Sequence, residues 1–274
     1  MNKYQAQIYK KEIADLYSSR SQTYDSSAWH DRMARKLVDF ANIQSDSQIL
    51  DIGTGTGMVA FYAASNIGPQ GSVIGIDISE GMLEKARSKL NACEVENVRF
   101  ELGDGEALDF PPSWFDFIFC GSAFIWMTDL NATFIHWKTF LKHHGKVGFH
   151  AFSENSFVTG VVAQSVLLEY GVNYLMSKPT GTVEKCHRLL EQSGFKNIDI
   201  EIDKDGHYIS LEEAKSAWVS TSHPAPGQYP HPLMALTPEQ LACARTDYEK
   251  EIEKLNTKDG VLNDITTFYI YGER

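Results

Sequence analysis

Residues 49–57 read Ile-Leu-Asp-Ile-Gly-Thr-Gly-Thr-Gly, an apolar run that ends in three alternating glycines. Glycine lets a chain turn sharply out of a strand and lets a ligand approach the backbone without meeting a Cβ atom. Helical spacing follows from Met58, and the start of a helix offers N–H groups without intrahelical partners. The stretch therefore predicts a buried strand, a tight turn and a helix at the edge of a binding site.

Apolar runs and helical spacing alternate on both sides of this stretch. Strands are predicted at residues 48–52, 72–76, 98–102, 115–120, 146–152, 195–202 and 267–274. Helices are predicted at residues 8–18, 28–41, 58–65, 80–91, 131–141 and 182–193. Because strands that alternate with helices form parallel βαβ units, the pattern predicts a doubly wound α/β fold.

The glycine-rich turn departs from the dinucleotide-binding pattern Gly-x-Gly-x-x-Gly. Met58 stands where the third glycine of that pattern would be, and Asp51 precedes the first glycine by two positions. A carboxylate at this point would repel a pyrophosphate, but it can help to hold a cationic amino-acid ligand through ordered water or backbone amides. A glycine-rich turn of another nucleotide-binding α/β protein remains the alternative.

The run from Ile49 to Gly57 resembles motif I of the class I S-adenosylmethionine (SAM)-dependent methyltransferases, and the order of elements matches theirs from about residue 45 to 150. The resemblance implies a Rossmann-like, seven-stranded sheet with an antiparallel C-terminal strand. It also implies lid helices at 1–44, a SAM-binding core at 45–152, 181–210 and 264–274, and cap insertions at 153–180 and 211–263.

Two carboxylates after the glycine-rich turn fit a nucleoside. Asp77 ends the second predicted strand, where it can accept hydrogen bonds from both ribose hydroxyls. It could instead cap the next helix, a role that Ser79 would fill equally well. The resemblance assigns Asp104 to the adenine amine and Met82 to the adenine face, although Gly-Asp-Gly is also a common turn. The predicted cofactor-binding residues are Tyr24, Asp51, Gly53, Thr54, Gly55, Gly57, Asp77, Ile78, Met82, Gly103, Asp104, Gly105, Glu106, Cys120, Gly121 and Ser122.

Aromatic residues before and after this core predict the walls of an acceptor pocket. Tyr24 can close over the sulfonium, whose charge favours aromatic faces, or can simply pack the lid onto the sheet. Trp126 is either a pocket wall or a core residue, and Ile125 replaces a histidine found in quinone-biosynthesis relatives. The cap aromatics either wall an apolar pocket or pack on the sheet. The predicted substrate-binding residues are Tyr17, Trp126, Tyr170, Tyr174, Trp218, His223 and Tyr229.

A general base is required only for some acceptors. A neutral amine or an activated carbon needs none, whereas a phenol or a carboxylic acid can lose its proton to a nearby histidine. His150, at the end of the fifth predicted strand, and His223, in the cap, are the candidate catalytic bases. Either can equally be a structural histidine.

Composition and charge limit the kinds of ligand and partner that we expect. The formal net charge is −11, without a basic stripe, so we do not expect a nucleic-acid partner. The four cysteines are scattered, and no acidic cluster suggests a metal, so we expect no metal. No apolar run is long enough to span a bilayer and the N-terminal residues lack the apolar core of a signal peptide, so we expect a cytoplasmic protein without stable membrane insertion. We further expect a monomer or a homodimer.

The sequence therefore predicts a methyltransferase that uses SAM, releases S-adenosylhomocysteine (SAH) and acts on a small, aromatic or apolar metabolite. In-line transfer would be driven by proximity and orientation. Whether nitrogen, oxygen or carbon is methylated stays open. The alternative is a non-catalytic protein that binds SAM or another nucleoside as a regulatory or assembly partner.

Overall fold

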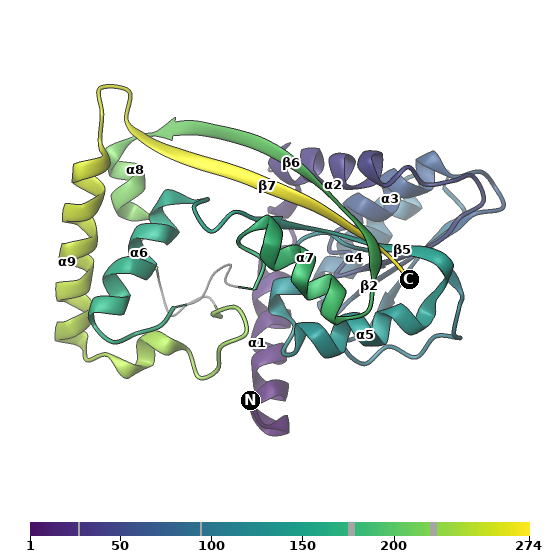
Figure 1. Ribbon diagram of the computed structural model, residues 1–274, viewed down its shortest axis with the longest axis horizontal. Helices are drawn as coiled ribbons and strands as arrows, with labels where there is room; N and C mark the ends of the chain where they lie inside the picture. The colour runs from purple at the N-terminus through teal and green to yellow at the C-terminus, as the bar shows by residue number, and fades with distance from the viewer. Residues whose placement is uncertain (27, 94, 175–178, 220–223) are drawn as a thin grey trace.

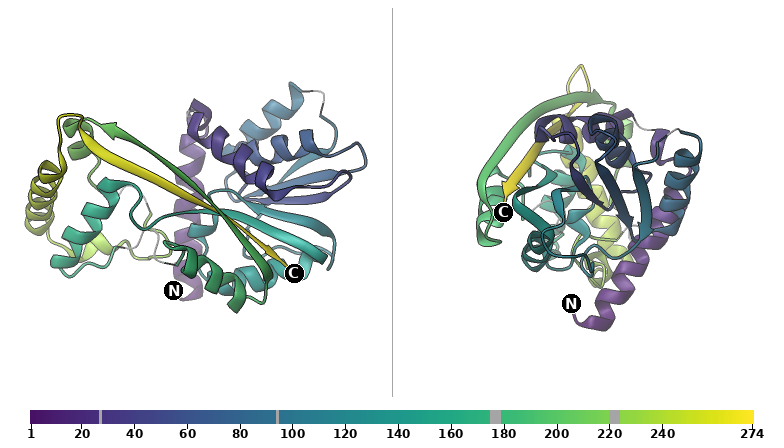
Figure 2. Two further views of the ribbon diagram at one scale, coloured as in Figure 1. Left: turned by 45° about the horizontal axis from the view of Figure 1, so that its top comes forward. Right: turned by 90° about the vertical axis from the view of Figure 1, so that its right-hand side faces the viewer.

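The computed structural model describes residues 1–26, 28–93, 95–174, 179–219 and 224–274. A sheet flanked by helices lies at one end, and a smaller group formed by α6, α8 and α9 lies at the other (Figure 1). A long hairpin joins the two, as the left view of Figure 2 shows most clearly. We call the smaller group, together with the hairpin end that it packs on, the cap.

The sheet has the order β3-β2-β1-β4-β5-β7-β6. Neighbouring strands are parallel except β7, which is antiparallel to both β5 and β6. Strand order reverses between β1 and β4, where open α/β sheets bind their ligands. The predicted seven-stranded sheet with an antiparallel C-terminal strand is confirmed. The strands are β1 (Gln48–Ile52), β2 (Ser72–Asp77), β3 (Val98–Leu102), β4 (Phe115–Cys120), β5 (Leu141–Phe152), β6 (Lys196–Ile209) and β7 (Val261–Glu273).

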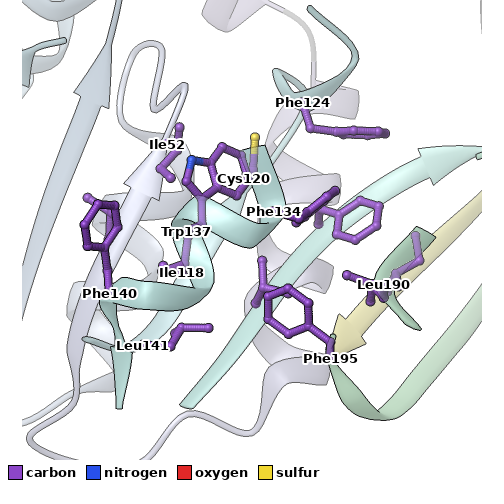
Figure 3. Packing of buried hydrophobic residues seen from close by; sticks show 14 of the residues in the cluster. Ile52, Ile118, Cys120, Phe124, Phe134, Trp137, Phe140, Leu141, Leu190 and Phe195 are labelled. Carbon is purple, nitrogen blue, oxygen red and sulfur yellow. The ribbon is translucent and has the colours of Figure 1, made fainter. Parts of the chain in front are cut away.

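Helices cover both faces of the sheet. One buried cluster joins α2, α3 and α4 to one face, and a second joins α5 and α7 to the other. The second cluster includes Trp137 and Phe134 of α5 and Leu190 of α7 (Figure 3). The helices are α1 (Lys3–Arg20), α2 (Ala28–Ala41), α3 (Met58–Asn66), α4 (Glu80–Asn91), α5 (Leu130–Phe140), α6 (Val158–Glu169), α7 (Val183–Gln192), α8 (Leu211–Ser216) and α9 (Pro238–Leu255), with 3-10 turns η1 (Tyr24–Ser26), η2 (Phe124–Trp126) and η3 (Pro232–Ala235).

The hairpin of β6 and β7 is longer than predicted. The strands pair from Lys196 opposite Glu273 to Ile209 opposite Val261, so both continue well beyond residues 195–202 and 267–274. The acidic stretch Asp203–Gly206 resembles a turn in sequence, but β6 is an edge strand that can expose such residues. The extra length carries the cap away from the sheet.

The cap has a hydrophobic cluster of its own. Leu167 of α6 and Tyr248 and Ile252 of α9 pack with Ile209 and Val261 at the end of the hairpin. The two predicted insertions therefore meet in one body, while the exact division into lid, core and cap stays a prediction. Among the described residues, no helix is long and apolar enough to cross a membrane.

Candidate functional site

Two adjoining cavities open where β1, β2 and β4 end. The larger has a volume of about 710 Å³ and the smaller of about 450 Å³. Both are lined by Tyr24, Gly53, Gly55 and Ser122, so the glycine-rich turn lies between them. Together they form the candidate site.

The larger cavity brings most of the predicted cofactor residues together. They come from α1, η1, the glycine-rich turn, the ends of β2 and β3, and the loop after β4. The predicted residues that line it are Tyr17, Tyr24, Gly53, Gly55, Asp77, Ile78, Met82, Gly103, Asp104, Gly105, Glu106, Ser122 and Trp126, joined by Lys10, Ile13, Ile52, Ala123 and Met127.

The smaller cavity extends from the glycine-rich turn toward β5. It is lined by four further predicted residues, Asp51, Thr54, Gly121 and His150, and by six that the sequence did not single out. Those six are His30, Met33, Ala34, Thr56, Met58 and Val59.

Gly55 and Gly57 of the glycine-rich turn differ in what surrounds them. At Gly55, where φ is +56°, a Cβ would meet nothing within 4 Å, so the position faces open space in the site. Gly57, by contrast, lines neither cavity, and a Cβ there would lie 2.7 Å from the ring of Phe100. Gly57 therefore allows α3 to pack against the sheet, and the structure does not bring it to the predicted cofactor site.

Asp77 is held at the wall of the larger cavity by backbone N–H groups. Its Oδ2 accepts from the Gly55 N–H at 2.8 Å and its Oδ1 accepts from the Ser79 N–H at 2.8 Å. Burial raises the pKa of Asp77, and these hydrogen bonds oppose the rise. Ser79 caps α4 by accepting from the Met82 N–H, so the alternative role of Asp77 as the helix cap is wrong. Each carboxylate oxygen keeps lone pairs for a ligand hydroxyl.

Asp51 carries an oxygen without a partner. Its Oδ2 accepts from the Thr54 hydroxyl at 2.6 Å, while its Oδ1 is buried and makes no hydrogen bond. Burial raises the pKa of Asp51 to about 7, and the nearby Asp77 adds to the rise. A buried polar atom without a partner costs free energy, so this carboxylate fits a ligand that brings a donor such as an ammonium group.

Lys10 of α1 closes the far end of the larger cavity, and no sequence motif marks it. Its ammonium lies 2.7 Å from Asp104 Oδ2 and 2.7 Å from Glu106 Oε2. Glu106 Oε1 also accepts from the N–H of Thr128 at 2.9 Å and of Asp129 at 3.1 Å, which fixes the loop after η2. Burial raises the pKa of Glu106, but the hydrogen bonds from Lys10 and Thr128 outweigh it and the pKa is lowered.

Aromatic rings form a continuous wall across both cavities. The Trp126 indole N–H donates to the Tyr17 hydroxyl at 3.0 Å, and the Tyr17 ring lies edge-on to Tyr24 at 6.3 Å. Tyr24 in turn stacks on His30 at 4.3 Å between ring centroids. Because burial raises the pKa of Tyr17 and of Tyr24, both phenols stay neutral. Such a wall suits a sulfonium and a planar acceptor.

Two histidines lie at the smaller cavity. The Nε2 of His150 lies 2.9 Å from the Ser122 hydroxyl, and burial lowers the pKa of His150 to about 3. Burial also lowers the pKa of His30, and the Nδ1 atoms of both rings are buried without hydrogen-bond partners. The sequence pointed to His150 but not to His30, which no motif distinguishes from other helical residues.

Several predicted residues lie away from the cavities. Cys120 packs with Trp137 in the core, where burial raises the pKa of its thiol (Figure 3). The other described residues of this kind belong to the cap, where aromatic rings fill the cap's own interior or bond to its helices. They are Tyr170, which donates to Asp247; Tyr174, which contacts the His231 ring; and Trp218, which packs on Tyr248. Tyr229 lies between α8 and η3 and lines neither cavity. His223 lies outside the described residues.

No group of three or more His, Cys, Asp or Glu side chains within the described part of the chain is placed to hold a metal ion. The carboxylates of the site are instead spread along the two cavities, and Asp104 and Glu106 share Lys10 as a partner. Asp77 and Asp104 belong to the larger cavity and Asp51 to the smaller. This spacing suits an elongated organic ligand with several separate polar groups.

Part of the chain is similar in sequence to known methyltransferases. The chain is 33% identical over 143 residues to aklanonic acid methyltransferase from Streptomyces sp. (strain C5), which covers 52% of this chain and 65% of the relative. It is 33% identical over 116 residues to nocamycin O-methyltransferase from Saccharothrix syringae, which covers 42% and 41%. The chain thus spans less than two thirds of the length of these curated relatives.

The same fold is found in a solved structure of phosphoethanolamine N-methyltransferase 2 from Haemonchus contortus in complex with S-adenosyl-L-methionine. The TM-score is 0.54 at 18% identity, and the match covers 89% of this chain and 52% of that one. Residues 49–145 match the family described as "Methyltransferase domain". Residues 49–145 are therefore similar to a methyltransferase domain, and the chain shares the fold of that SAM-bound structure.

Proposed function

We propose that the protein transfers a methyl group from SAM to a small-molecule acceptor and releases SAH. The observation that carries the proposal is the pair of adjoining cavities at the strand-order reversal, with separate carboxylates along them and an aromatic wall on one side. The matched methyltransferase domain includes the glycine-rich turn between the cavities. The larger cavity is the nucleoside side and the smaller one the methyl-transfer side.

The residues of the two cavities have complementary roles in this proposal. Asp77 accepts from the ribose hydroxyls and Asp104 from the adenine amine, with Met82 and Ile78 as apolar surface for the base. Asp51 receives the ammonium group of the methionine moiety, either directly or through water, because its Oδ1 has no partner. The remaining predicted cofactor residues that line the cavities supply backbone contacts around these groups.

When bound, SAM supplies a methyl group that is already activated by the sulfonium. The chain's contribution is therefore to orient the acceptor in line with that methyl group and to exclude water. Tyr17, Tyr24 and Trp126 place aromatic faces at the cavities, where they favour a cation and exclude solvent. Helix α1 closes the larger cavity through Lys10 and Ile13.

A small, aromatic or apolar acceptor is favoured by the same wall. The relatives named above act on aklanonic acid and nocamycin by their names, which accords with a small molecule of this kind. The net charge of −11 does not favour a nucleic acid. A cytoplasmic location, and a monomeric or homodimeric state, remain predictions from the sequence.

The test is calorimetric titration of the protein with SAM, SAH and NAD in parallel. We expect SAM and SAH to bind and NAD not to bind, because Asp51 would repel a pyrophosphate beside the glycine-rich turn. Binding of NAD, or of none of the three ligands, would contradict the proposal. Transfer of a labelled methyl group from SAM to a panel of metabolites then separates an enzyme from a protein that only binds SAM.

A further inference from the structure

The smaller cavity carries, besides Asp51, two histidines that the proposed cofactor site does not use. His30 of α2 and His150 of β5 lie on its wall, and aromatic rings connect them. Trp29 lies 5.0 Å from His30 and stacks on Phe152 at 5.6 Å, and Phe152 lies 5.4 Å from His150. The rings of Trp29 and Phe152, which do not line the cavity themselves, therefore link the two imidazoles from behind.

Both imidazoles have hydrogen-bonding capacity left over. The Nδ1 atoms of His30 and His150 are buried without partners. Leaving a buried polar group unpaired is costly, so two such atoms at one cavity indicate that a ligand supplies their partners. Burial lowers the pKa of both rings, which are therefore neutral near pH 7 and able to accept a proton or a hydrogen bond.

Few charged groups lie near the His30 side chain. Its surroundings include the Tyr24 backbone and Asp25 on η1, Arg20 at the end of α1, and His150 on β5. Asp51 is the only acidic side chain, and no lysine or arginine is present, among the residues that line this cavity in the described part of the chain. The cavity therefore offers no cation to hold an anionic acceptor, and its two neutral imidazoles suit an uncharged group that donates a hydrogen bond.

We propose that the histidine side of the smaller cavity is the acceptor subsite, that it takes the acidic hydroxyl of a planar molecule (a phenol or an enol), and that His30 receives the hydroxyl proton. The inference rests on the proposed methyl transfer from SAM. His150 is held by Ser122 and is 2% exposed, so it serves to position the acceptor. His30 is half-buried, which makes its protonated form less costly and lets the proton leave to water.

The proposed methyl transfer balances in bonds and in charge with the acceptor, SAM and His30 alone. The acceptor O–H bond breaks and its proton goes to the imidazole of His30, while the oxygen forms a bond to the methyl carbon. The carbon–sulfur bond breaks and its electron pair stays on sulfur, which becomes the neutral thioether of SAH. One positive charge is lost at sulfur and one is gained at His30, so the net charge of the site does not change. This equality offsets the cost of forming a buried imidazolium.

The first test needs no knowledge of the acceptor. The pKa of the His30 imidazole is measured by NMR on histidine-labelled protein saturated with SAM and then with SAH, with saturation checked by calorimetry. A sulfonium close to His30 disfavours its protonation, so we expect the pKa to be about one unit higher with SAH, a tenfold change in protonation constant. The exposed His187 on α7 serves as the internal reference and should not shift.

An equal pKa of His30 in the two complexes would overturn the assignment. Failure of SAM to bind would instead contradict the proposed function, so the two failures are distinguishable. The measurement uses the unmodified protein, and through-bond spectra assign the signal even where a His30→Gln variant does not fold.

The second test compares two acceptors that share one ring system, naphthol and naphthylamine. We expect methyl transfer to oxygen, with the rate in His30→Gln lowered about 100-fold, the scale of general base catalysis, and SAM affinity unchanged. His187→Gln is the matched control and should keep the full rate. Transfer to the amine nitrogen, or an unchanged rate in His30→Gln, would overturn the proposal.

Discussion

Asp77 is held in place before any ligand arrives. The Gly55 and Ser79 N–H groups fix its two oxygens, so little ordering remains when a ribose binds. We predict that Asp77→Asn weakens SAM binding by about 1.5–3 kcal/mol, the scale for hydrogen bonds to a charged group. Calorimetry measures the change. Asp259→Asn, on an exposed turn before β7, is the control and should bind SAM like the original protein.

An unchanged affinity in Asp77→Asn would mean that the ribose is held elsewhere. The amide also offers one fewer acceptor to the two N–H groups, so unfolding is measured alongside binding. A loss of affinity without a comparable loss of stability assigns the effect to the ligand.

Asp51 makes stability depend on pH in an unusual direction. Its pKa is about 7 in the folded chain against 3.8 unfolded, so the folded chain binds more protons between these values and stability falls as pH rises. His150 acts oppositely, since its pKa is about 3 folded against 6.5 unfolded and its contribution rises with pH. From about pH 4 to 6.5 the two slopes, each up to about 1.4 kcal/mol per pH unit, therefore oppose each other.

Asp51→Asn removes only the first of these slopes. We predict that the stability of the variant, relative to the original protein, increases steadily from pH 4 to pH 7 and is highest above pH 7. Urea unfolding at several pH values measures the difference. A pH-independent difference between the two proteins would show that Asp51 has an ordinary pKa in the folded chain.

At single positions the sequence predicted which residues line the cavities only where a local motif places them. The glycine-rich turn, Asp77 and Asp104 follow directly from their place after a strand. Lys10 and His30 were missed because each reaches the site only through packing of an N-terminal helix, and helical periodicity does not say which residue faces a ligand.

Helix α1 is attached to the core at two points along its length. Ser18 hydrogen-bonds Ser79 of the α4 cap at 2.8 Å, and Lys10 pairs with Asp104 and Glu106 about two turns earlier. Toward its start, the Tyr9 hydroxyl accepts from the Gly227 N–H of the cap at 2.7 Å. The helix thus spans the larger cavity and reaches the cap, as expected of a lid.

We predict that Lys10→Met speeds the dissociation of SAM about fivefold, because partly exposed ion pairs contribute up to about 1 kcal/mol. Stopped-flow displacement measures the rate. Lys11→Met is the matched control on the next residue, whose ion pair with Asp15 is exposed. Equal rates in the two variants would mean that Lys10 does not hold the lid.

Element boundaries were predictable where caps or glycines mark them and not elsewhere. Helix α4 occupies the predicted residues 80–91 because Ser79 caps it. Strands β6 and β7 were predicted too short, since half of their length is stabilised by the partner strand and by the cap. Such support comes from residues distant in sequence, which local patterns do not contain.

At the scale of the whole molecule, the aromatic residues of the cap pack within the cap and stabilise it. Tyr248 is fully buried, donates to the Ala214 carbonyl at 2.5 Å and packs on Trp218. This cluster shares no residue with the two clusters that flank the sheet. The aromatic residues that line the candidate site therefore come from α1, η1, α2 and the loop after β4, whereas the described aromatic residues of the cap do not line it.

We predict that Tyr248→Ala destabilises the cap by about 3–5 kcal/mol, the range for removing a large buried side chain. Amides of α6 and α9 should then exchange hydrogen faster, while those of β1 to β5 and the affinity for SAM should not change. Tyr208→Ala, on the exposed face of β6, is the control. A parallel loss of SAM binding in Tyr248→Ala would show that the cap supports the cofactor site, because the sheet retains its own two hydrophobic clusters whether or not the cap is ordered.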